Sequence, residues 1–303
     1  MAEYAVETKD LTKQFGRIVA LDKVNLHLTR GTVYGLVGKN GSGKSTLIRV
    51  LAGLSKPTSG GYVLFGREDS QKGFSSGRKL IGVAAEGAAL VPGETLETNL
   101  KRQCSLLGIP GKNRPAEVMK LTGLTEFART KAAKLPEEKP VLAAIAMALC
   151  GNPDLLLLDG PFEGLGAQQR ASVAALLASL NRELELSILV TASDPESLFG
   201  LATRYGILTH GDLVRELSSE EMKAAQETAL RVKVSDVNAL ARVLVAKDIR
   251  HRILDADTAD IYGKPQITEL VMALAKEGCD VLELEERTER AENLLDALGG
   301  GKV

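Results

Sequence analysis

The stretch that decides the fold runs from Tyr34 to Thr46 and reads YGLVGKNGSGKST. It begins within a short apolar run, residues 33–37, which is typical of a buried strand, and residues 47–54 after it have the pattern of a helix. Glycines at 38, 41 and 43 allow the backbone to curl until successive N–H groups point inward at phosphate oxygens. This spacing between a strand and a helix predicts a loop that binds the phosphates of a nucleoside triphosphate.

Side chains of the same loop supply the other groups that a bound triphosphate needs. Lys44 adds a positive charge for the terminal phosphates, Ser45 offers a hydroxyl to Mg²⁺, and the helix that follows points its positive end at the anion. The expected binding residues of the loop are Gly38, Lys39, Asn40, Gly41, Ser42, Gly43, Lys44, Ser45 and Thr46.

Composition and charge narrow the class of protein. The chain has 303 residues, of which 44% are hydrophobic and 25% charged, and its formal net charge is −1. That balance provides no long-range field for nucleic acid, so we expect no nucleic-acid partner. The three cysteines and three histidines are scattered, which favours neither a zinc site nor a disulfide framework. The longest apolar run, 141–150, is too short to cross a bilayer, and the start of the chain lacks the apolar core of a secretory signal, so we expect a cytoplasmic protein.

The pattern along the chain predicts two domains. Short apolar runs at 155–159 and 187–191 are typical of central parallel strands covered on both faces, and a helix-rich, alanine-rich stretch precedes them. After residue 229 the predicted order becomes βαββαβ, which is that of a ferredoxin-like module. We therefore predict a nucleotide-binding domain over 1–217 and an α+β ferredoxin-like domain over 229–303, joined by a helical linker at 218–228.

Three further features accompany the phosphate-binding loop: Phe15, the Lys56–Gly60 connection and the segment from Asn152 to Asp159. Together with the loop, they make residues 1 to about 215 resemble the ATP-binding subunit of ABC transporters. The resemblance is close to the bacterial exporter subgroup that includes antibiotic and lantibiotic resistance ATPases, and the C-terminal module is similar to the extra domain that many of them carry. The fold class it implies is α/β: a P-loop NTPase of ABC type with a mixed sheet core, an antiparallel β subdomain and a helical subdomain.

The resemblance also implies ligands and partners. ATP with Mg²⁺ is the expected nucleotide, and Phe15 would stack on adenine, although a packed core ring is the alternative interpretation. Asp159 would hold Mg²⁺ through water, and Glu86 stands where the family has a glutamine beside the metal. The expected partners are a polytopic membrane permease subunit, bound through the groove around residues 87–96, and a second ABC ATP-binding subunit, the same chain or a different one. This would place the protein at the inner face of the cell membrane.

Several positions depart from the family pattern in ways that affect hydrolysis. Gly160 stands where the family has the glutamate that activates the attacking water, and Ser193 stands where it has a histidine that contacts the terminal phosphate. Gly166 replaces the aspartate that couples the two sites of the dimer. A positioned general base contributes about 10²–10⁴-fold to a rate, so its loss predicts impaired or absent hydrolysis.

The family's signature segment, Leu-Ser-Gly-Gly, corresponds here to Leu135–Lys139, which places Glu137 and Glu138 in the expected first turn of a helix. In an ABC dimer this helix end faces the terminal phosphate bound by the other chain, so the two carboxylates would repel it. Two alternatives to a non-hydrolysing transport subunit remain open. One is a soluble regulatory ABC protein, and the other is an active transport ATPase in which Glu163 serves as a substitute catalytic residue.

Overall fold

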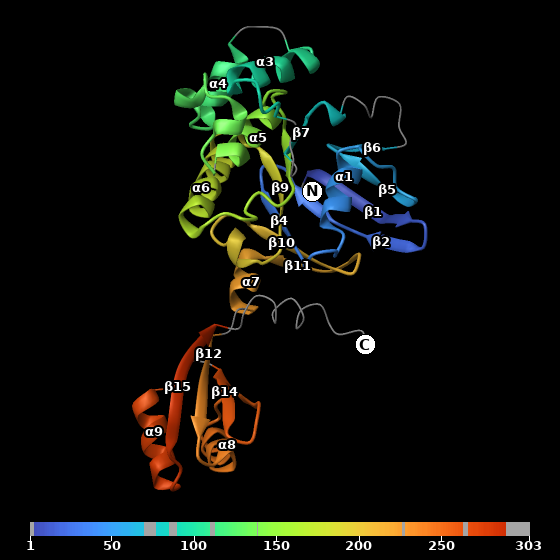
Figure 1. The fold of residues 1–303 in the computed structure, drawn as a ribbon. Coiled ribbons are helices and arrows are strands. Elements are labelled where there is room, and N and C mark those ends of the chain that lie inside the picture. Colours follow the sequence, from blue (N-terminus) through green and yellow to red (C-terminus); the bar gives the residue numbers. More distant parts are fainter. Residues whose placement is uncertain are drawn as a thin grey trace. The chain divides into compact units, whose positions relative to one another are not determined.

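The chain forms two compact units, which divide in the sequence between Ser219 and Glu220, inside the segment expected as a linker (Figure 1). The fold comes from a computed structural model. The residues that it describes are 3–69, 77–84, 90–109, 113–137, 139–225, 228–262 and 266–288.

A six-stranded mixed sheet lies at the centre of the first unit. Its strands, in spatial order, are β11 (Asp212–Ser218), β10 (Arg204–Thr209), β4 (Val33–Val37), β9 (Ser187–Ala192), β8 (Leu155–Leu158) and β7 (Ile81–Ala84). All neighbours pair in parallel except β10 and β11, which pair antiparallel. Strands β4, β8 and β9 are buried along their whole length, as continuous apolar runs in a parallel sheet require. Their carboxyl ends meet at one edge of the sheet, where such sheets bind ligands.

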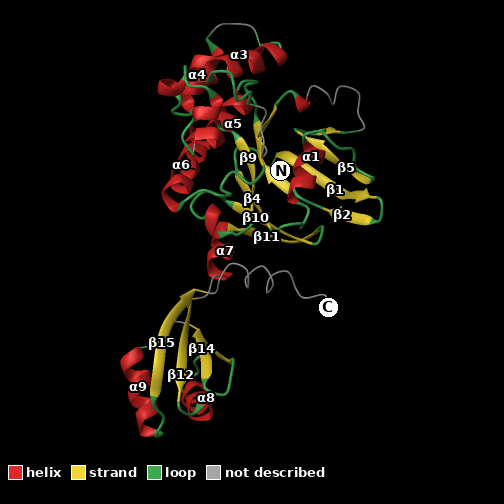
Figure 2. Cartoon of the chain, viewed as in Figure 1, coloured by secondary structure: helices red, strands yellow, loops and turns green. Residues whose placement is uncertain are grey.

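Helices cover this sheet and form a subdomain beside it (Figure 2). They are α1 (Lys44–Leu51), α3 (Leu96–Leu106), α4 (Arg114–Leu121), α5 (Lys139–Leu149) and α6 (Ala167–Leu184), with short 3₁₀ turns at Thr125–Phe127, Ala132–Lys134 and Glu196–Leu198. Helices α3, α4 and α5 pack on one another, and α5 also packs on β7. In the part of the chain that the structure describes, no helix combines the length and the apolar character that crossing a membrane requires.

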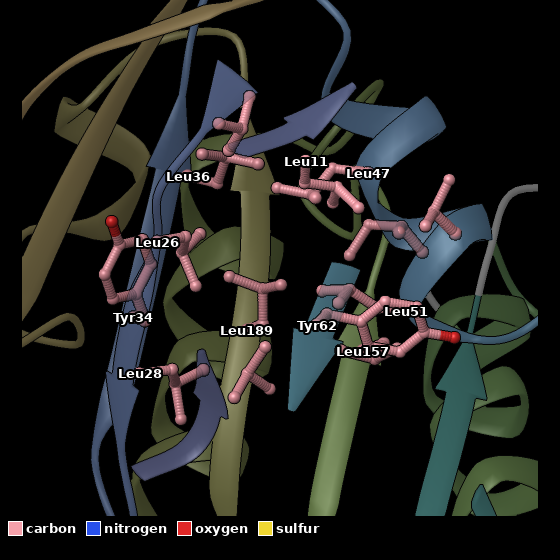
Figure 3. Close-up of a cluster of buried hydrophobic side chains, with 14 of the residues drawn as sticks. Leu11, Leu26, Leu28, Tyr34, Leu36, Leu47, Leu51, Tyr62, Leu157 and Leu189 are labelled. Atoms are coloured by element: carbon pink, nitrogen blue, oxygen red, sulfur yellow. The ribbon is translucent and has the colours of Figure 1, made fainter. Parts of the chain in front are cut away.

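An antiparallel sheet packs against the mixed sheet. It contains β1 (Tyr4–Phe15), β2 (Ile18–Val24), β3 (His27–Thr29), β5 (Ser59–Leu64) and β6 (Arg67–Glu68), in the order β2-β1-β5-β6 with β3 paired to β1. The cluster between the sheets, drawn in Figure 3, joins Leu11 and Leu26 to Leu36 and Leu189 of the mixed sheet. Leu47 of α1 is buried in the same cluster, and burying a leucine side chain contributes about 1.5–3 kcal/mol. This packing holds the helix that follows the phosphate-binding loop.

The second unit is an α+β module. It includes α7 (Ser219–Ala225) from Glu220 onward, followed by β12 (Thr228–Val234), α8 (Val237–Ala246), β13 (His251–Ile253), β14 (Thr258–Tyr262), α9 (Ile267–Lys276) and β15 (Val281–Thr288). The four strands form an antiparallel sheet in the order β13-β14-β12-β15, which is the ferredoxin-like order. Val232 and Ile261 of the sheet pack with Leu244 of α8 and Leu274 of α9 in a separate core. The unit therefore has its own hydrophobic interior, as an independent domain needs.

Candidate nucleotide-binding site

The phosphate-binding loop lies between β4 and α1, and its glycines are required by close packing. A Cβ on Gly38 would lie 2.2 Å from the backbone oxygen of Leu208, and one on Gly43 would lie 2.4 Å from that of Ala20. Gly43 also has a φ of +110°, which side-chain-bearing residues rarely adopt. The glycines at these two positions therefore let the loop follow its path against β10 and β2.

A cavity of about 410 Å³ opens beside this loop, and we call it the phosphate-loop cavity. Its lining residues are Ile18, Val19, Ala20, Asn40, Gly41, Ser42, Gly43, Lys44, Ser45, Thr46, Asp159, Gly160 and Glu163. The apolar members come from the start of β2, and the polar members come from the loop, α1 and the segment after β8. A cavity with one apolar wall and one polar wall suits a ligand that has a flat base and charged phosphates.

The surroundings of Ser42 and Lys44 show whether the loop is suited to bind an anion. The Ser42 Oγ is buried and has no hydrogen-bond partner among the described residues. Such an orphaned donor is costly unless a ligand or water satisfies it, and a phosphate oxygen would do so. Lys44 is only 7% exposed, and its Nζ donates to the backbone oxygens of Gly38 and Lys39. Burial lowers the pKa of Lys44, and the carboxylates of Glu163 and Asp159 act in the opposite direction.

Ser45 and Asp159, next to Lys44, offer two oxygen atoms that could be ligands of a metal ion. The Ser45 Oγ donates to Asp159 Oδ1 at 3.1 Å, and the Thr191 Oγ1 donates to the same carboxylate oxygen at 2.9 Å. A hydroxyl and a carboxylate at this spacing fit Mg²⁺, which binds few protein oxygens and takes its remaining ligands from phosphate and water. Within the described ranges no group of three or more His, Cys, Asp or Glu residues could hold a metal by itself. Glu86, which we expected beside the metal, lies outside the described residues.

The segment after β8 brings Gly160, Glu163 and Ser193 together. The N–H of Gly160 donates to Thr191 Oγ1 at 2.8 Å, and the N–H of Glu163 donates to the Gly160 oxygen at 3.1 Å. The Ser193 Oγ lies 3.3 Å from Glu163 Oε1 and 3.3 Å from Asn40 Oδ1. A second cavity, of about 300 Å³, adjoins this group and shares Asn40 and Glu163 with the phosphate-loop cavity. Position 160 carries no side chain, and position 193 carries a neutral hydroxyl rather than a cation.

Phe15 lies at the end of β1 and is 50% exposed, so it is not the packed core ring of the alternative interpretation. The Lys13 Nζ lies 4.7 Å from the centre of its ring. Ile18 and Val19, which line the phosphate-loop cavity, are 70% and 45% exposed. Sequence reasoning missed these two residues, although an apolar pair directly after an exposed turn is a usable signal for a base-binding surface.

The structure corrects the expected start of the helix after Leu135. Helix α5 begins at Lys139, so Glu137 lies in the turn before the helix and is exposed, rather than in the first helical turn. The Lys139 Nζ lies 5.4 Å from the centre of the Phe127 ring. Glu138 lies outside the described residues. Gly166 precedes α6, and its N–H donates to Gln169 Oε1 at 2.7 Å.

Comparison with known proteins identifies relatives of this chain. The sequence profile of the ABC transporter family matches residues 21–163. The bacitracin transport ATP-binding protein BcrA of Bacillus licheniformis is 30% identical over 305 residues, covering 98% of this chain and 98% of BcrA. The methionine import ATP-binding protein MetN of Mesorhizobium japonicum is 34% identical over 217 residues, covering 70% of this chain and 60% of MetN.

Solved structures give the same fold. The ATP-binding cassette MJ0796, in a dimeric post-hydrolysis state bound to ADP and Pi, superposes with a TM-score of 0.63 at 27% identity, covering 71% of this chain and 98% of that one. CbiO1 of Clostridium perfringens, part of the transporter complex cbiONQ, superposes with a TM-score of 0.66 at 21% identity, covering 80% of this chain and 95% of that one. The fold expected from the sequence, a P-loop NTPase of ABC type, is therefore confirmed.

Proposed function

The chain belongs to the ABC transporter family as an ATP-binding subunit, and we propose that it is an exporter-type subunit that binds MgATP and hydrolyses it slowly or not at all. One observation carries the proposal. The groups that would hold a bound triphosphate, from Asn40 to Thr46 with Asp159, line one cavity, whereas positions 160 and 193 offer neither a carboxylate nor a cation.

The exporter assignment is supported by how far each relative matches. Similarity to BcrA covers 98% of the chain and so includes the C-terminal unit, whereas similarity to the import protein MetN covers 70%. A shared second domain is a stronger sign of a common role than a shared ATP-binding domain, because one nucleotide-binding fold can operate in either direction of transport.

MgATP binding follows from the chemistry of the cavity. Backbone N–H groups at the start of α1, the Ser42 hydroxyl and the Lys44 ammonium are donors for phosphate oxygens. Ser45 and Asp159 are the residues that would hold Mg²⁺. Phe15, Ile18 and Val19 present exposed apolar surface on which an adenine ring could stack.

Slow hydrolysis follows from what replaces the reactive groups. Gly160 has no side chain to activate water, and a positioned base is worth about 10²–10⁴-fold. The Ser193 hydroxyl can donate one hydrogen bond to a phosphate, but it supplies no positive charge for the transition state.

The proposed partners are a polytopic permease at the inner face of the cell membrane and a second ABC subunit. In a head-to-tail dimer of this family, Glu137 would approach the terminal phosphate on the other chain, and two like charges about 4 Å apart repel by about 4 kcal/mol at an effective dielectric of 20. Two such sites in a homodimer double the repulsion. A heterodimer with a consensus subunit keeps one favourable site, so we favour an asymmetric pair.

Calorimetry of the purified 303-residue chain with MgATP and MgADP tests the proposal, with phosphate release measured in parallel. We expect micromolar-range binding of both nucleotides and a rate far below one turnover per second. Absence of binding would contradict the proposal that this chain binds ATP. A rate of several turnovers per second would leave the ATP-binding role in place and overturn the slow-hydrolysis part.

Reconstitution with the membrane partner tests the direction of transport. Labelled bacitracin is the first probe, because the relative BcrA is named for its transport. In proteoliposomes with the ATP-binding subunit on the outside, an exporter moves the probe into the lumen when ATP is added. ATP-dependent loss of the label from the lumen would identify an importer instead.

A further inference from the structure

We infer that Glu163 carries the carboxylate that activates the attacking water, so that the turnover remaining in this subunit depends on residue 163 and not on residue 160. The inference rests on the proposed function, because it assigns a group to the same nucleotide site. Glu163 lies on the turn that follows β8, three residues after Gly160, and the hydrogen bond from its N–H to the Gly160 oxygen closes that turn.

The carboxylate of Glu163 occupies the space that a side chain at position 160 would need. A Cβ on Gly160 would lie 3.0 Å from the Glu163 Cδ and 3.2 Å from its Oε1. Gly160 also has a φ of +59°, a conformation that a residue with a side chain adopts at a cost. The glycine therefore makes room for the carboxylate that folds back over it.

Three observations place this carboxylate beside the phosphate-binding loop. It lines the phosphate-loop cavity together with Ser45 and Asp159. Its negative charge, with that of Asp159, raises the pKa of Lys44 against the effect of burial. Its Oε1 lies 3.3 Å from the Ser193 hydroxyl, which holds it against the phosphate-binding loop. Among the described lining residues, Glu163 and Asp159 are the acids of that cavity, and Asp159 already accepts from Ser45 and Thr191.

The reaction that this geometry supports is water attack on the terminal phosphorus of ATP. The water oxygen forms a bond to phosphorus, and the bond from phosphorus to the bridging oxygen breaks, so that ADP leaves with the electron pair. Glu163 accepts the water proton and passes it to the released phosphate or to solvent. A carboxylate can perform this step without a redox partner or a second co-reactant.

Substitution of Glu163 by Gln tests the inference with a nearly isosteric change. We expect turnover to fall at least tenfold in E163Q, while the affinity for ATP stays within twofold of the wild type or increases, because a negative charge beside the phosphates is removed. E163D keeps a shorter carboxylate and should retain an intermediate rate. Glu196→Gln is the matched control, since Glu196 is exposed, lies near Ser193 in sequence and lines neither cavity.

The outcomes separate this inference from the proposed function. Equal turnover in wild type and E163Q, or no measurable turnover in wild type, overturns the role of Glu163 while MgATP binding keeps the proposed function intact. A parallel fall of turnover and ATP affinity in E163Q would show a structural role rather than a reacting one. Loss of ATP binding in the wild-type protein is the separate result that removes the proposed function itself.

Discussion

Restoring a glutamate at position 160 should not restore rapid hydrolysis, although the family pattern suggests that it would. The backbone at Gly160 has a φ of +59°, and forcing a side-chain-bearing residue into this region costs about 1–2 kcal/mol. The new Cβ would also lie 3.0 Å from the Glu163 Cδ, so the existing carboxylate must rotate away from Ser193. The variant gains a carboxylate on a strained backbone and displaces the one already in place.

The expected result for Gly160→Glu is a turnover within about threefold of the wild type, against the 10²–10⁴-fold that a well-placed base supplies. Thermal stability of the first unit should fall as well. At about 2–4 °C per kcal/mol for a unit of this size, a cost of about 1–2 kcal/mol lowers the melting temperature by about 2–8 °C. Differential scanning calorimetry and a phosphate-release assay on the same preparation measure both effects.

Gly164 provides a matched control for the backbone. Its φ is +73°, similar to that of Gly160, but a Cβ there would meet nothing within 4 Å. Gly164→Ala therefore measures the cost of the conformation alone, and Gly160→Ala adds the collision with Glu163. We expect the Gly160 variant to lose more stability and more turnover than the Gly164 variant. A hundredfold gain of turnover in Gly160→Glu, or equal losses in the two alanine variants, would refute the reasoning.

Three further predictions concern binding, domains and assembly. Lys44→Ala should weaken MgATP binding about a thousandfold by calorimetry, since a charge pair about 4 Å apart at an effective dielectric of 20 is worth about 4 kcal/mol. Burial lowers the pKa of Lys44 and the Glu163 carboxylate opposes this, so ATP affinity should fall at alkaline pH as Lys44 loses its proton. In E163Q the same fall should begin at a lower pH. Truncation after Lys223 should leave a nucleotide-binding core, and insoluble or non-binding material would contradict two independent domains. Replacing residues 136–138 by Ser-Gly-Gly should increase ATP-dependent dimerisation in light scattering. Equal dimerisation before and after the change would show that Glu137 and Glu138 do not oppose it.

The fold was predictable because its signals are local. The glycines at 38 and 43 identify the loop by spacing alone, and the structure explains them by contacts of 2.2 and 2.4 Å with neighbouring backbone. The buried strands β4, β8 and β9 are continuous apolar runs, a pattern that needs no partner to be recognised. The order of elements in the C-terminal unit follows from alternating periods of two and 3.6 residues.

Side-chain surroundings were less predictable, because they depend on residues distant in the sequence. From the sequence, Phe15 could be either a core ring or an exposed one. The pairing of β1 with β2 decides between them, because it places Phe15 at the tip of a hairpin. Thr191 lies within an apolar run, so the sequence gives no sign of its role. Its two hydrogen bonds, with Asp159 and Gly160, form only because β8 and β9 are neighbours. Glu163 was recognisable as a nearby acid, but its return toward Gly160 depends on a left-handed turn that composition does not reveal.

The site separates the groups that hold ATP from those that would drive its hydrolysis. The loop, Lys44 and the Ser45–Asp159 pair are the groups that would bind the phosphates and Mg²⁺ of ATP in its ground state. Binding that is no stronger in the transition state lowers the concentration of ATP required without raising the rate. The groups that could act more strongly on the transition state are reduced to one exposed carboxylate on a turn and one neutral hydroxyl. Because the groups that would bind ATP are retained and those that would drive hydrolysis are reduced, the site should be occupied by ATP rather than by its products when ATP exceeds the dissociation constant. A subunit with this balance suits the nucleotide-holding half of an asymmetric pair, in which the partner's site sets the rate of transport.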